Sequence, residues 1–291
     1  MDKICIIDTS RENIGQYAMC GYKDPKNRGY QHKINWVKER FSEGLRYKIL
    51  ESEEKGAVGA IEYLPGQYAW RPVKAHNYMF IHCIYIMSKK YKGLGYGAKM
   101  LDECIRDSRE SGMSGVAVVV RKGSWMAKEA LFLKAGFIEY DRTGPDFKLL
   151  ALKFNENAPD PFFTVDQDLP DNINDGLTII TSAQCPYTYK AVTEISETAV
   201  QEFKLNPNII QLEDAQEAQH TPGAFGTFMI LYDGKVVADH PVSNTRFRNI
   251  MKSLLSTPSL SYSFSSLRTS LTAPTKKDRS IVLLPLVVAS F

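Results

Sequence analysis

The sequence lacks the features that mark several large classes of protein. Its 291 residues include five cysteines, and no two of these have the spacing of zinc ligands or of a redox pair. The longest apolar run, 281–291, is about half the length of a membrane-spanning helix and contains Pro285. The first residues do not form the apolar core of a signal peptide. We therefore expect a cytoplasmic protein with reduced thiols, no membrane span and no metal site.

The chain also has little net charge. Its formal charge is +3, from 36 basic and 33 acidic residues. Residues 253–291 contain four basic residues and one acid, Asp278, so this tail accounts for the whole excess. A neutral body gives no electrostatic reason to expect nucleic acid as a partner.

Hydrophobic patterning predicts an α/β (α+β) protein in two parts. Within residues 1–154, strands are expected at 3–8, 46–51, 57–63, 78–87, 115–121, 137–141 and 147–154, and helices at 31–41, 96–108 and 125–135. Within residues 176–252, we expect strands at 177–181, 209–212, 228–232 and 236–239, and a helix at 186–203. Residues 155–175 have the prolines and polar residues of a linker, and the Ser/Thr/Leu-rich residues 253–291 predict a poorly ordered tail.

The segment after the long strand at 78–87 is the most informative. A glycine-rich turn leads at once into a helix, and Lys92 stands before it. Glycines bend the backbone tightly, and a helix start offers unpaired N–H groups and a positive dipole end. The segment therefore predicts a pyrophosphate cradle, with a tight connection that binds nothing as the alternative. The turn residues are Gly93, Leu94, Gly95, Tyr96 and Gly97.

Two familiar nucleotide motifs do not fit this turn. A Walker loop is excluded because no Gly-Lys-Ser/Thr follows the glycines. A Rossmann fingerprint would follow the first strand of a parallel sheet, whereas this turn comes after four candidate strands.

Two motifs instead resemble those of the GCN5-related N-acetyltransferase (GNAT) family. Residues 92–97 resemble its Arg/Gln-x-x-Gly-x-Gly/Ala signature, with lysine in the first place, and residues 127–137 resemble its Ala-x-x-Leu-Tyr-x-x-x-Gly-Phe corner. They stand in the family's order, with a buried strand between them. The resemblance covers roughly residues 1–153. It implies a mixed sheet flanked by helices and splayed between its fourth and fifth strands.

The resemblance also implies acetyl-CoA as the cosubstrate, bound in that splay. Its pyrophosphate would lie on the turn, and a backbone N–H of Ile86 or Met87 would stabilise the oxyanion. Where the family has a tyrosine as general acid, this chain has Phe132. The implied cofactor-binding residues are Ile86, Met87, Lys92, Gly93, Leu94, Gly95, Tyr96, Gly97 and Phe132.

A carboxylate or an imidazole is needed to take a proton from the attacking amine. Glu62 and His82 are the candidates, with a solvated strand residue and a buried core histidine as the alternatives. An aromatic loop contains or adjoins Tyr63, Trp70 and Arg71. We expect its aromatic side chains to form one wall of the substrate site, a substrate wall, and Arg71 to bind an anionic group of the substrate as an anion clamp. A hairpin that packs its own aromatic side chains is the alternative there.

The second part has one prominent thiol, Cys185, which follows a strand and opens a helix. A helix N-terminus lowers the pKa of a thiol and favours the reactive thiolate. With Thr221-Pro222 before a later strand, this part resembles a thioredoxin-like fold, in which such a proline is cis and faces the cysteine. Thr188 stands where a resolving cysteine would be, so two-thiol exchange is excluded. A monothiol site and an idle thiol both remain open.

Together the two parts resemble the YoaP-like acetyltransferases. The sequence predicts a monomeric or homodimeric enzyme that transfers acetyl from acetyl-CoA to the primary amine of a small molecule by direct attack on the thioester. The predicted catalytic residues are Glu62, His82 and Cys185. One alternative is a non-catalytic acyl-CoA sensor that recruits a redox partner through Cys185. A thiol oxidoreductase is disfavoured because Cys185 is the lone cysteine of the second part.

Overall fold

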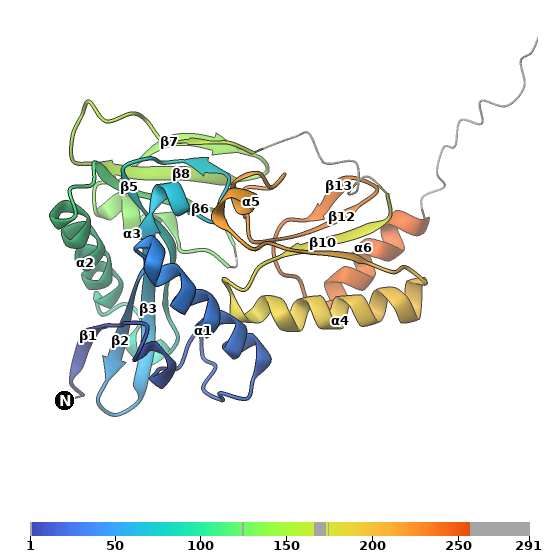
Figure 1. Ribbon diagram of the computed structural model, residues 1–291, viewed down its shortest axis with the longest axis horizontal. Coiled ribbons are helices and arrows are strands. Elements are labelled where there is room, and N and C mark those ends of the chain that lie inside the picture. The colour runs from blue at the N-terminus through green and yellow to red at the C-terminus, as the bar shows by residue number, and fades with distance from the viewer. Residues whose placement is uncertain (1, 124, 166–172, 174, 257–291) are drawn as a thin grey trace, which may run out of the picture.

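The structure is a computed structural model that describes residues 2–123, 125–165, 173 and 175–256 (Figure 1). Its last helix, α6 (Asn244–Ser256), extends past the predicted start of the tail at residue 253. Residues 253–256 are therefore helical, and the rest of the predicted tail lies outside the described residues. Within the described part of the chain, no helix has both the length and the apolarity to cross a membrane.

A seven-stranded mixed sheet forms the N-terminal part. Its order is β1-β2-β3-β5-β6-β8-β7, and only the β5–β6 pair is parallel. The strands are β1 (Ile4–Asp8), β2 (Arg46–Ser52), β3 (Gly56–Pro65), β5 (Tyr78–Ile86), β6 (Gly115–Val120), β7 (Ile138–Thr143) and β8 (Phe147–Lys153). The helices are α1 (Arg28–Arg40), α2 (Tyr96–Glu110) and α3 (Glu129–Lys134). The predicted fold class is confirmed, although the helix expected at 125–135 is shorter.

Strands β5 and β6 separate toward their carboxyl ends. Their pairing covers only residues 78–81 of β5 and 115–118 of β6, whereas β5 continues to Ile86. The backbone beyond this pairing lines an opening in the sheet. This opening is the splay predicted between the fourth and fifth strands.

A β-bulge lies where the splay begins. Glu62 pairs with Cys83 and Tyr63 pairs with Ile81, so His82 is an extra residue in β5. A bulge increases the local twist and changes the direction of the side chain. The extra residue directly follows Ile81, the last residue of β5 that pairs with β6.

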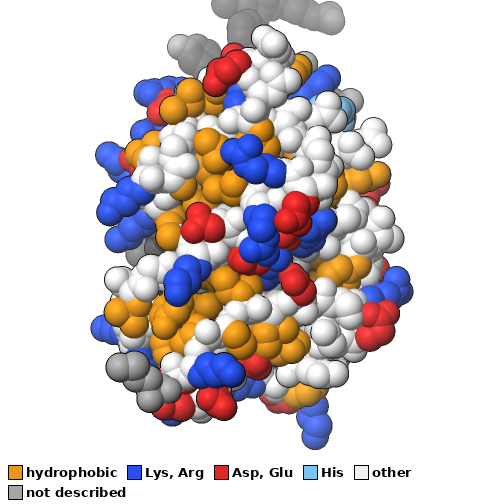
Figure 2. Space-filling view, turned by 90° about the vertical axis from the view of Figure 1, so that its left-hand side faces the viewer, with side chains coloured by type: hydrophobic (Ala, Val, Ile, Leu, Met, Phe, Trp, Pro, Cys, Tyr) orange, Lys and Arg blue, Asp and Glu red, His pale blue; other side chains and the backbone are white. Residues whose placement is uncertain are grey.

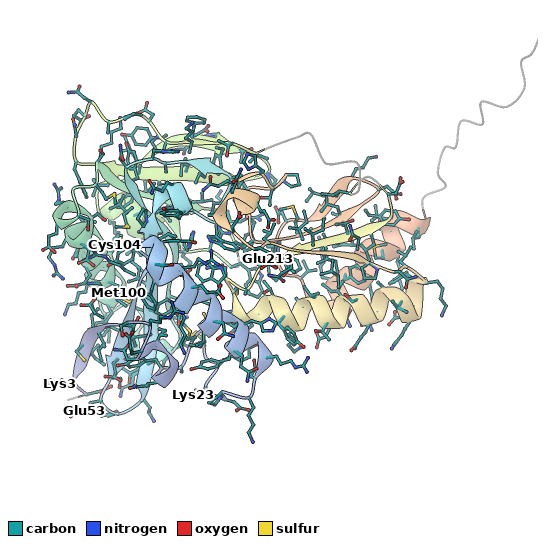
Figure 3. The ribbon with its side chains drawn as sticks, viewed as in Figure 1. Lys3, Lys23, Glu53, Met100, Cys104 and Glu213 are labelled. Atoms are coloured by element: carbon teal, nitrogen blue, oxygen red, sulfur yellow. The ribbon has the colours of Figure 1, made fainter. Side chains whose placement is uncertain are left out.

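Helix α2 covers one face of the large sheet. Met100 and Cys104, one helical turn apart, are fully buried against that face (Figure 3). Glu103 of the same helix forms ion pairs with the buried Lys48 of β2 and with the exposed Arg106. Figure 2, which views this side of the molecule, shows basic and acidic side chains next to one another. This face carries no broad patch of one sign, as expected for a neutral body.

The C-terminal part is a second, smaller α/β unit. Its sheet has the order β11-β10-β12-β13, with β10 and β11 parallel and the other pairs antiparallel. Its strands are β10 (Leu177–Thr181), β11 (Asn208–Gln211), β12 (Phe228–Tyr232) and β13 (Lys235–Ala238), and α4 (Pro186–Phe203) and α5 (Ala215–Gln219) precede α6. A two-stranded sheet of β4 (Val73–Lys74) and β9 (Phe162–Phe163) lies between the two parts of the chain.

The predicted cis bond in this unit is wrong. Among the described residues, Gly144–Pro145 is the cis peptide, so Thr221–Pro222 is trans. The βαβ pattern of the unit is present, and its thioredoxin-like identity stays a prediction.

The two parts pack against each other across a shared hydrophobic core. Trp70 of the first part and Met229 of the second are fully buried in the same cluster. A Cβ on Gly29 of α1 would lie 2.3 Å from the carbonyl oxygen of Pro186, so the absence of a side chain lets the start of α4 approach α1. The two parts therefore share one core, and the predicted domain bounds and linker stay predictions.

Candidate active site

A cavity of about 270 Å³ opens where β5 and β6 separate. Residues 81–85 and Met87 line one side, and Val118, Val119 and residues 125–127 line another. Three residues close the cavity from outside the large sheet: Cys20 before α1, and Cys185 and Tyr187 at the start of α4. The second unit therefore forms part of the wall of the sheet opening.

The predicted phosphate turn lies at the same carboxyl end of β5. Gly93 and Gly95 have φ values of +79° and +81°, a region that favours glycine. The first intrahelical bond of α2 runs from the Lys99 N–H to the Gly95 carbonyl at 3.1 Å. The N–H groups of residues 96–98 precede this bond and have no helical partner. Residues 92–95 are exposed, so the helix start is open to an anion.

The backbone of β5 distinguishes the two candidate oxyanion donors. Met87 donates its N–H to the carbonyl oxygen of Val58 at 2.8 Å, so this group points toward β3. Successive N–H groups along a strand point to opposite sides, which directs the Ile86 N–H toward the opening. The predicted role of the Met87 N–H is wrong because that donor is already used. The Met87 side chain still lines the cavity.

Phe132 does not contact a cofactor site in this structure. Its side chain is fully buried and packs edge to face on Phe137, with 5.5 Å between the ring centroids. Its position in α3 directs it into the core beneath the helix. The predicted cofactor contact of Phe132 is therefore wrong, because no surface of the ring is exposed.

Glu62 is a buried partner in a charge network rather than a solvated strand residue. It forms an ion pair with Lys33 of α1, which is itself buried, and its Oε1 accepts a hydrogen bond from Gln184 Nε2 at 2.9 Å. Burial alone raises the pKa of Glu62, but the charge of Lys33 and hydrogen bonds from His82 and Gln184 lower it to about 2. A carboxylate held in this way is a poor proton acceptor.

His82 lines the cavity, but its ring nitrogens face protein groups. Its Nε2 accepts the backbone N–H of Trp70 at 2.8 Å, and its Nδ1 lies 3.3 Å from Glu62 Oε1. Burial lowers the pKa of His82 to about 4 in spite of the neighbouring carboxylate. The lone pair that would accept a proton is already engaged, so the contacts favour the interpretation as a core histidine.

Tyr63 and Trp70 do not form a substrate wall. Both side chains are fully buried. Tyr63 lies on the α2 face, where its hydroxyl donates to Asp107 Oδ2 at 2.6 Å, and Trp70 packs edge to face on Trp36 at 5.2 Å. The alternative, a hairpin that packs its own aromatic side chains, does not describe the segment either, because Tyr63 and Trp70 lie in separate clusters and contact α2 and α1.

Arg71 joins the two parts of the chain instead of binding an anion. Its guanidinium donates to the carbonyl oxygen of Phe225 and to Thr227 Oγ1, and it stacks on the Phe225 ring. Burial lowers its pKa to about 10. The predicted anion clamp is therefore wrong, because the guanidinium of Arg71 already donates to groups of the second unit.

The environment of Cys185 differs from the one predicted. The residue caps α4 and lines the cavity, as expected from its place in the sequence. Burial nevertheless raises the pKa of its thiol, against the opposing hydrogen bond from the Tyr187 backbone. Burial also raises the pKa of Cys20, to about 12. Burial therefore opposes the effect of the helix start on this thiol, which favours the idle thiol among the two alternatives that the sequence left open.

Several residues of the site were not predicted from the sequence. Lys33 had a readable signal, because it falls between Tyr30 and Val37 on the apolar face of α1. Cys20 and Gln184 had none, since they reach the site only through the packing of the two parts.

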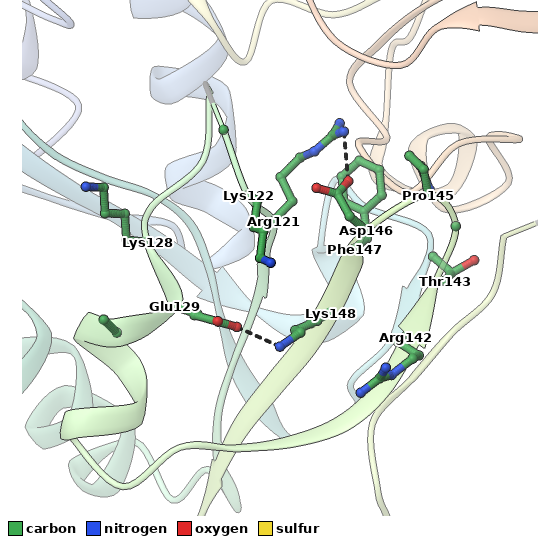
Figure 4. A pocket seen from close by; sticks show the side chains of 13 residues that line it. Arg121, Lys122, Lys128, Glu129, Arg142, Thr143, Pro145, Asp146, Phe147 and Lys148 are labelled. Carbon is green, nitrogen blue, oxygen red and sulfur yellow. Dashed lines mark hydrogen bonds and ion pairs between the residues drawn. The ribbon is translucent and has the colours of Figure 1, made fainter.

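A larger pocket of about 830 Å³ lies beside the β7–β8 turn and shares no lining residue with the cavity (Figure 4). Ion pairs cross it from Lys148 to Glu129 at 2.9 Å and from Arg121 to Asp146 at 2.8 Å. These two ion pairs use both acidic residues of the lining and two of its five basic residues. The pocket contains none of the predicted site residues.

Comparisons with known proteins agree with this geometry. Residues 12–137 match the model of the acetyltransferase (GNAT) family, and residues 208–249 match that of the YoaP-like family. The chain is 32% identical over 258 residues to a relative described as the uncharacterized N-acetyltransferase YoaP of Bacillus subtilis (strain 168), covering 86% of this chain and the whole relative.

Solved structures with similar folds include two acetyltransferases. One is YncA, a putative acetyltransferase from Salmonella typhimurium with its cofactor acetyl-CoA, which is 16% identical over 54% of this chain and 97% of its own, with a TM-score of 0.39. The other is a GNAT-family acetyltransferase from Staphylococcus aureus Mu50, 16% identical over 53% of this chain and all of its own, with a TM-score of 0.39.

A splayed mixed sheet with an open helix start at the end of β5 defines an acyl-CoA-dependent transferase. The chain belongs to the GNAT family of acetyltransferases, with the domain order of the YoaP-like N-acetyltransferases. The predicted enzyme class is confirmed, and acetyl-CoA is the cosubstrate of this class.

The cavity position of Cys185 leads to a labelling prediction. At pH 7 we expect iodoacetamide to modify exposed Cys5 at least ~10-fold faster than Cys185, because burial raises the Cys185 pKa and the thiolate is the reactive form. CoA should slow labelling of Cys185 further and leave Cys5 unchanged. Peptide mass spectrometry over time measures both rates. Rapid labelling of Cys185, unaffected by CoA, would contradict both the burial and the position of this thiol.

Proposed function

We propose that the protein transfers the acetyl group of acetyl-CoA to the primary amine of a small molecule. The observation that carries this proposal is that the open start of α2 and the cavity meet at one end of β5. An anion on the N–H groups of residues 96–98 thus lies beside an opening in the sheet. A pyrophosphate there would direct the pantetheine arm along β5 toward the cavity.

The residues of β5 suggest how the reaction proceeds. The Ile86 N–H is directed into the opening, where it can donate to the thioester oxygen as negative charge develops. The amine attacks the carbonyl carbon, a C–N bond forms, and the C–S bond breaks to release CoA. Binding and orientation are the main contributions of the protein in this scheme.

The closure by the second unit supports a small acceptor. Cys185 and Tyr187 occupy the side of the opening across from β5 and β6. A protein tail would have to displace the start of α4, which is fixed by close packing at Gly29. A small molecule needs only the cavity itself.

An acyl-CoA sensor that does not catalyse transfer is the second candidate. It is favoured by Phe132, which cannot donate a proton and is buried away from the cavity. A thiolate is a good leaving group, however, so the lack of a general acid does not prevent transfer.

Release of free thiol from acetyl-CoA distinguishes the two candidates. We expect at least one amine from a panel of small primary amines to raise the rate of CoA release ~100-fold over hydrolysis. A thiol reagent detects the released CoA at a fixed acetyl-CoA concentration. Mass spectrometry should show an acetylated amine in equal amount. Binding of acetyl-CoA by calorimetry with no release by any amine would support the sensor. The cytoplasmic location and the monomeric or homodimeric state stay predictions.

A further inference from the structure

Among the residues that the structure describes, none of those that line the cavity between the splayed strands carries a formal charge. Thiols, apolar side chains, aromatic rings and one histidine make up its wall. The nearest charged side chains stand behind this wall and are engaged elsewhere. Lys33 and Glu62 form an ion pair with each other, and Arg71 bonds to the second unit.

The titratable groups in the wall are held in their neutral forms. Burial raises the pKa values of Cys83, Cys185 and Tyr85, and burial lowers that of His82 to about 4. None of these groups supplies a negative charge near neutral pH. An alkylammonium ion would enter this cavity without a counterion, and burying an unpaired ammonium is strongly unfavourable.

Aromatic and sulfur atoms give the cavity a preference for flat rings. Trp125 and Tyr187 meet edge to face with their centroids 5.6 Å apart, and Cys20 and Cys185 add polarisable sulfur. The Tyr85 hydroxyl is fixed by the Cys20 N–H at 2.9 Å and by the Tyr47 hydroxyl at 3.2 Å. Such walls favour edge and offset contacts with an aromatic ligand. The volume of about 270 Å³ lies below the range of roughly 300–1,000 Å³ of typical ligand pockets.

We propose that the acceptor is a weakly basic aromatic primary amine with a single ring. This inference rests on the proposed acetyltransferase function and specifies its substrate class. The charge-free wall favours a neutral amine over an ammonium ion, and the aromatic and sulfur lining favours a ring. The small volume, which the acceptor shares with the acetyl end of acetyl-CoA, limits the acceptor to a single ring.

The reaction of an arylamine also matches the absence of a free base in the site. An arylamine is neutral at pH 7, so its nitrogen attacks the thioester carbon without a prior deprotonation. The C–N bond forms and the C–S bond breaks. The proton that the nitrogen then releases goes to the departing sulfur, so CoA leaves as the thiol. No step requires His82 or Glu62, whose acceptor atoms are engaged by Trp70, Lys33 and other groups.

Two isomeric amines test the inference. The isomers 4-methylaniline and benzylamine have the same atoms but differ strongly in basicity. At pH 7 we expect kcat/KM for acetylation of 4-methylaniline to exceed that of benzylamine at least ~10-fold, measured by CoA release and product mass. Preference for benzylamine would overturn the inference and leave the acetyltransferase function intact. Release with neither amine, although acetyl-CoA binds by calorimetry, would also overturn it, whereas lack of acetyl-CoA binding would contradict the proposed function.

A charge added to the wall gives a second test. Met87 lines the cavity and is 45% exposed, so a polar residue there should not prevent folding. We expect Met87→Glu to shift the ratio of the two kcat/KM values at least ~5-fold toward benzylamine, because its carboxylate pairs with an ammonium. Met87→Gln, of the same size without the charge, is the control. An equal shift in both variants would contradict the electrostatic argument.

Discussion

The Gly95→Glu variant should bind acetyl-CoA at least ~100-fold more weakly than the wild type, a loss of about 2.7 kcal/mol, and should show no measurable turnover. Gly95 caps α2, directly before the N–H groups that are proposed to hold the pyrophosphate. A carboxylate at this position accepts those N–H groups itself and repels an incoming anion. Calorimetry with acetyl-CoA and the thiol-release assay measure the two effects.

Gly112→Glu is the matched control for this variant. Gly112 follows the other end of α2, has a φ of +69°, is exposed and has no neighbour within 4 Å of an added Cβ. Both variants therefore add the same charge and a similar backbone strain of roughly 1–2 kcal/mol. We expect the control to bind acetyl-CoA as the wild type does. Equal loss in the two variants would show that strain, rather than the anion cradle, is responsible.

Local sequence patterns predicted the elements that position the site. The helix expected at 186–203 is α4 with the same bounds, because Pro186 suits the first helical position and the apolar period is regular. The strand at 78–87 and the glycine turn after it were also expected at their observed places. These features depend on residues that are near one another in the chain.

The roles of the polar residues were less predictable, because their partners are distant in the sequence. Glu62 was expected to be either a base or a solvated residue, yet its partners come from α1 and from Gln184, 122 positions later. Arg71 likewise bonds to groups more than 150 positions away. One-dimensional spacing does not show that two parts of a chain will share a core. The thiol of Cys185 illustrates the same point, since a helix start alone favours thiolate while burial opposes it.

Glu62→Gln should lower the free energy of unfolding by about 3–5 kcal/mol, because it leaves the buried Lys33 without its counter-charge. Urea denaturation followed by circular dichroism measures this loss. Glu194→Gln, the same substitution in the exposed pair with Lys190, should leave the free energy of unfolding unchanged within the error of the measurement. Replacing both buried partners, in Lys33→Met/Glu62→Gln, should recover most of the stability, since no unpaired charge is then left in the core.

Below pH 4.5 the free energy of unfolding of the wild type should fall with decreasing pH more steeply than that of Glu62→Gln. The pKa of Glu62 is lowered from 4.5 to about 2 in the folded state, so its stabilisation is complete above pH 4.5 and is lost as the pH falls toward 2. The pKa of His82 is lowered from 6.5 to about 4, which also removes stability as the pH falls, but between 6.5 and 4. The wild type should lose stability through both ranges, and Glu62→Gln should lack the part below pH 4.5. If Glu62→Gln instead kept wild-type stability and lost only turnover, Glu62 would be the general base after all, and the ion pair with Lys33 would have to open during the reaction.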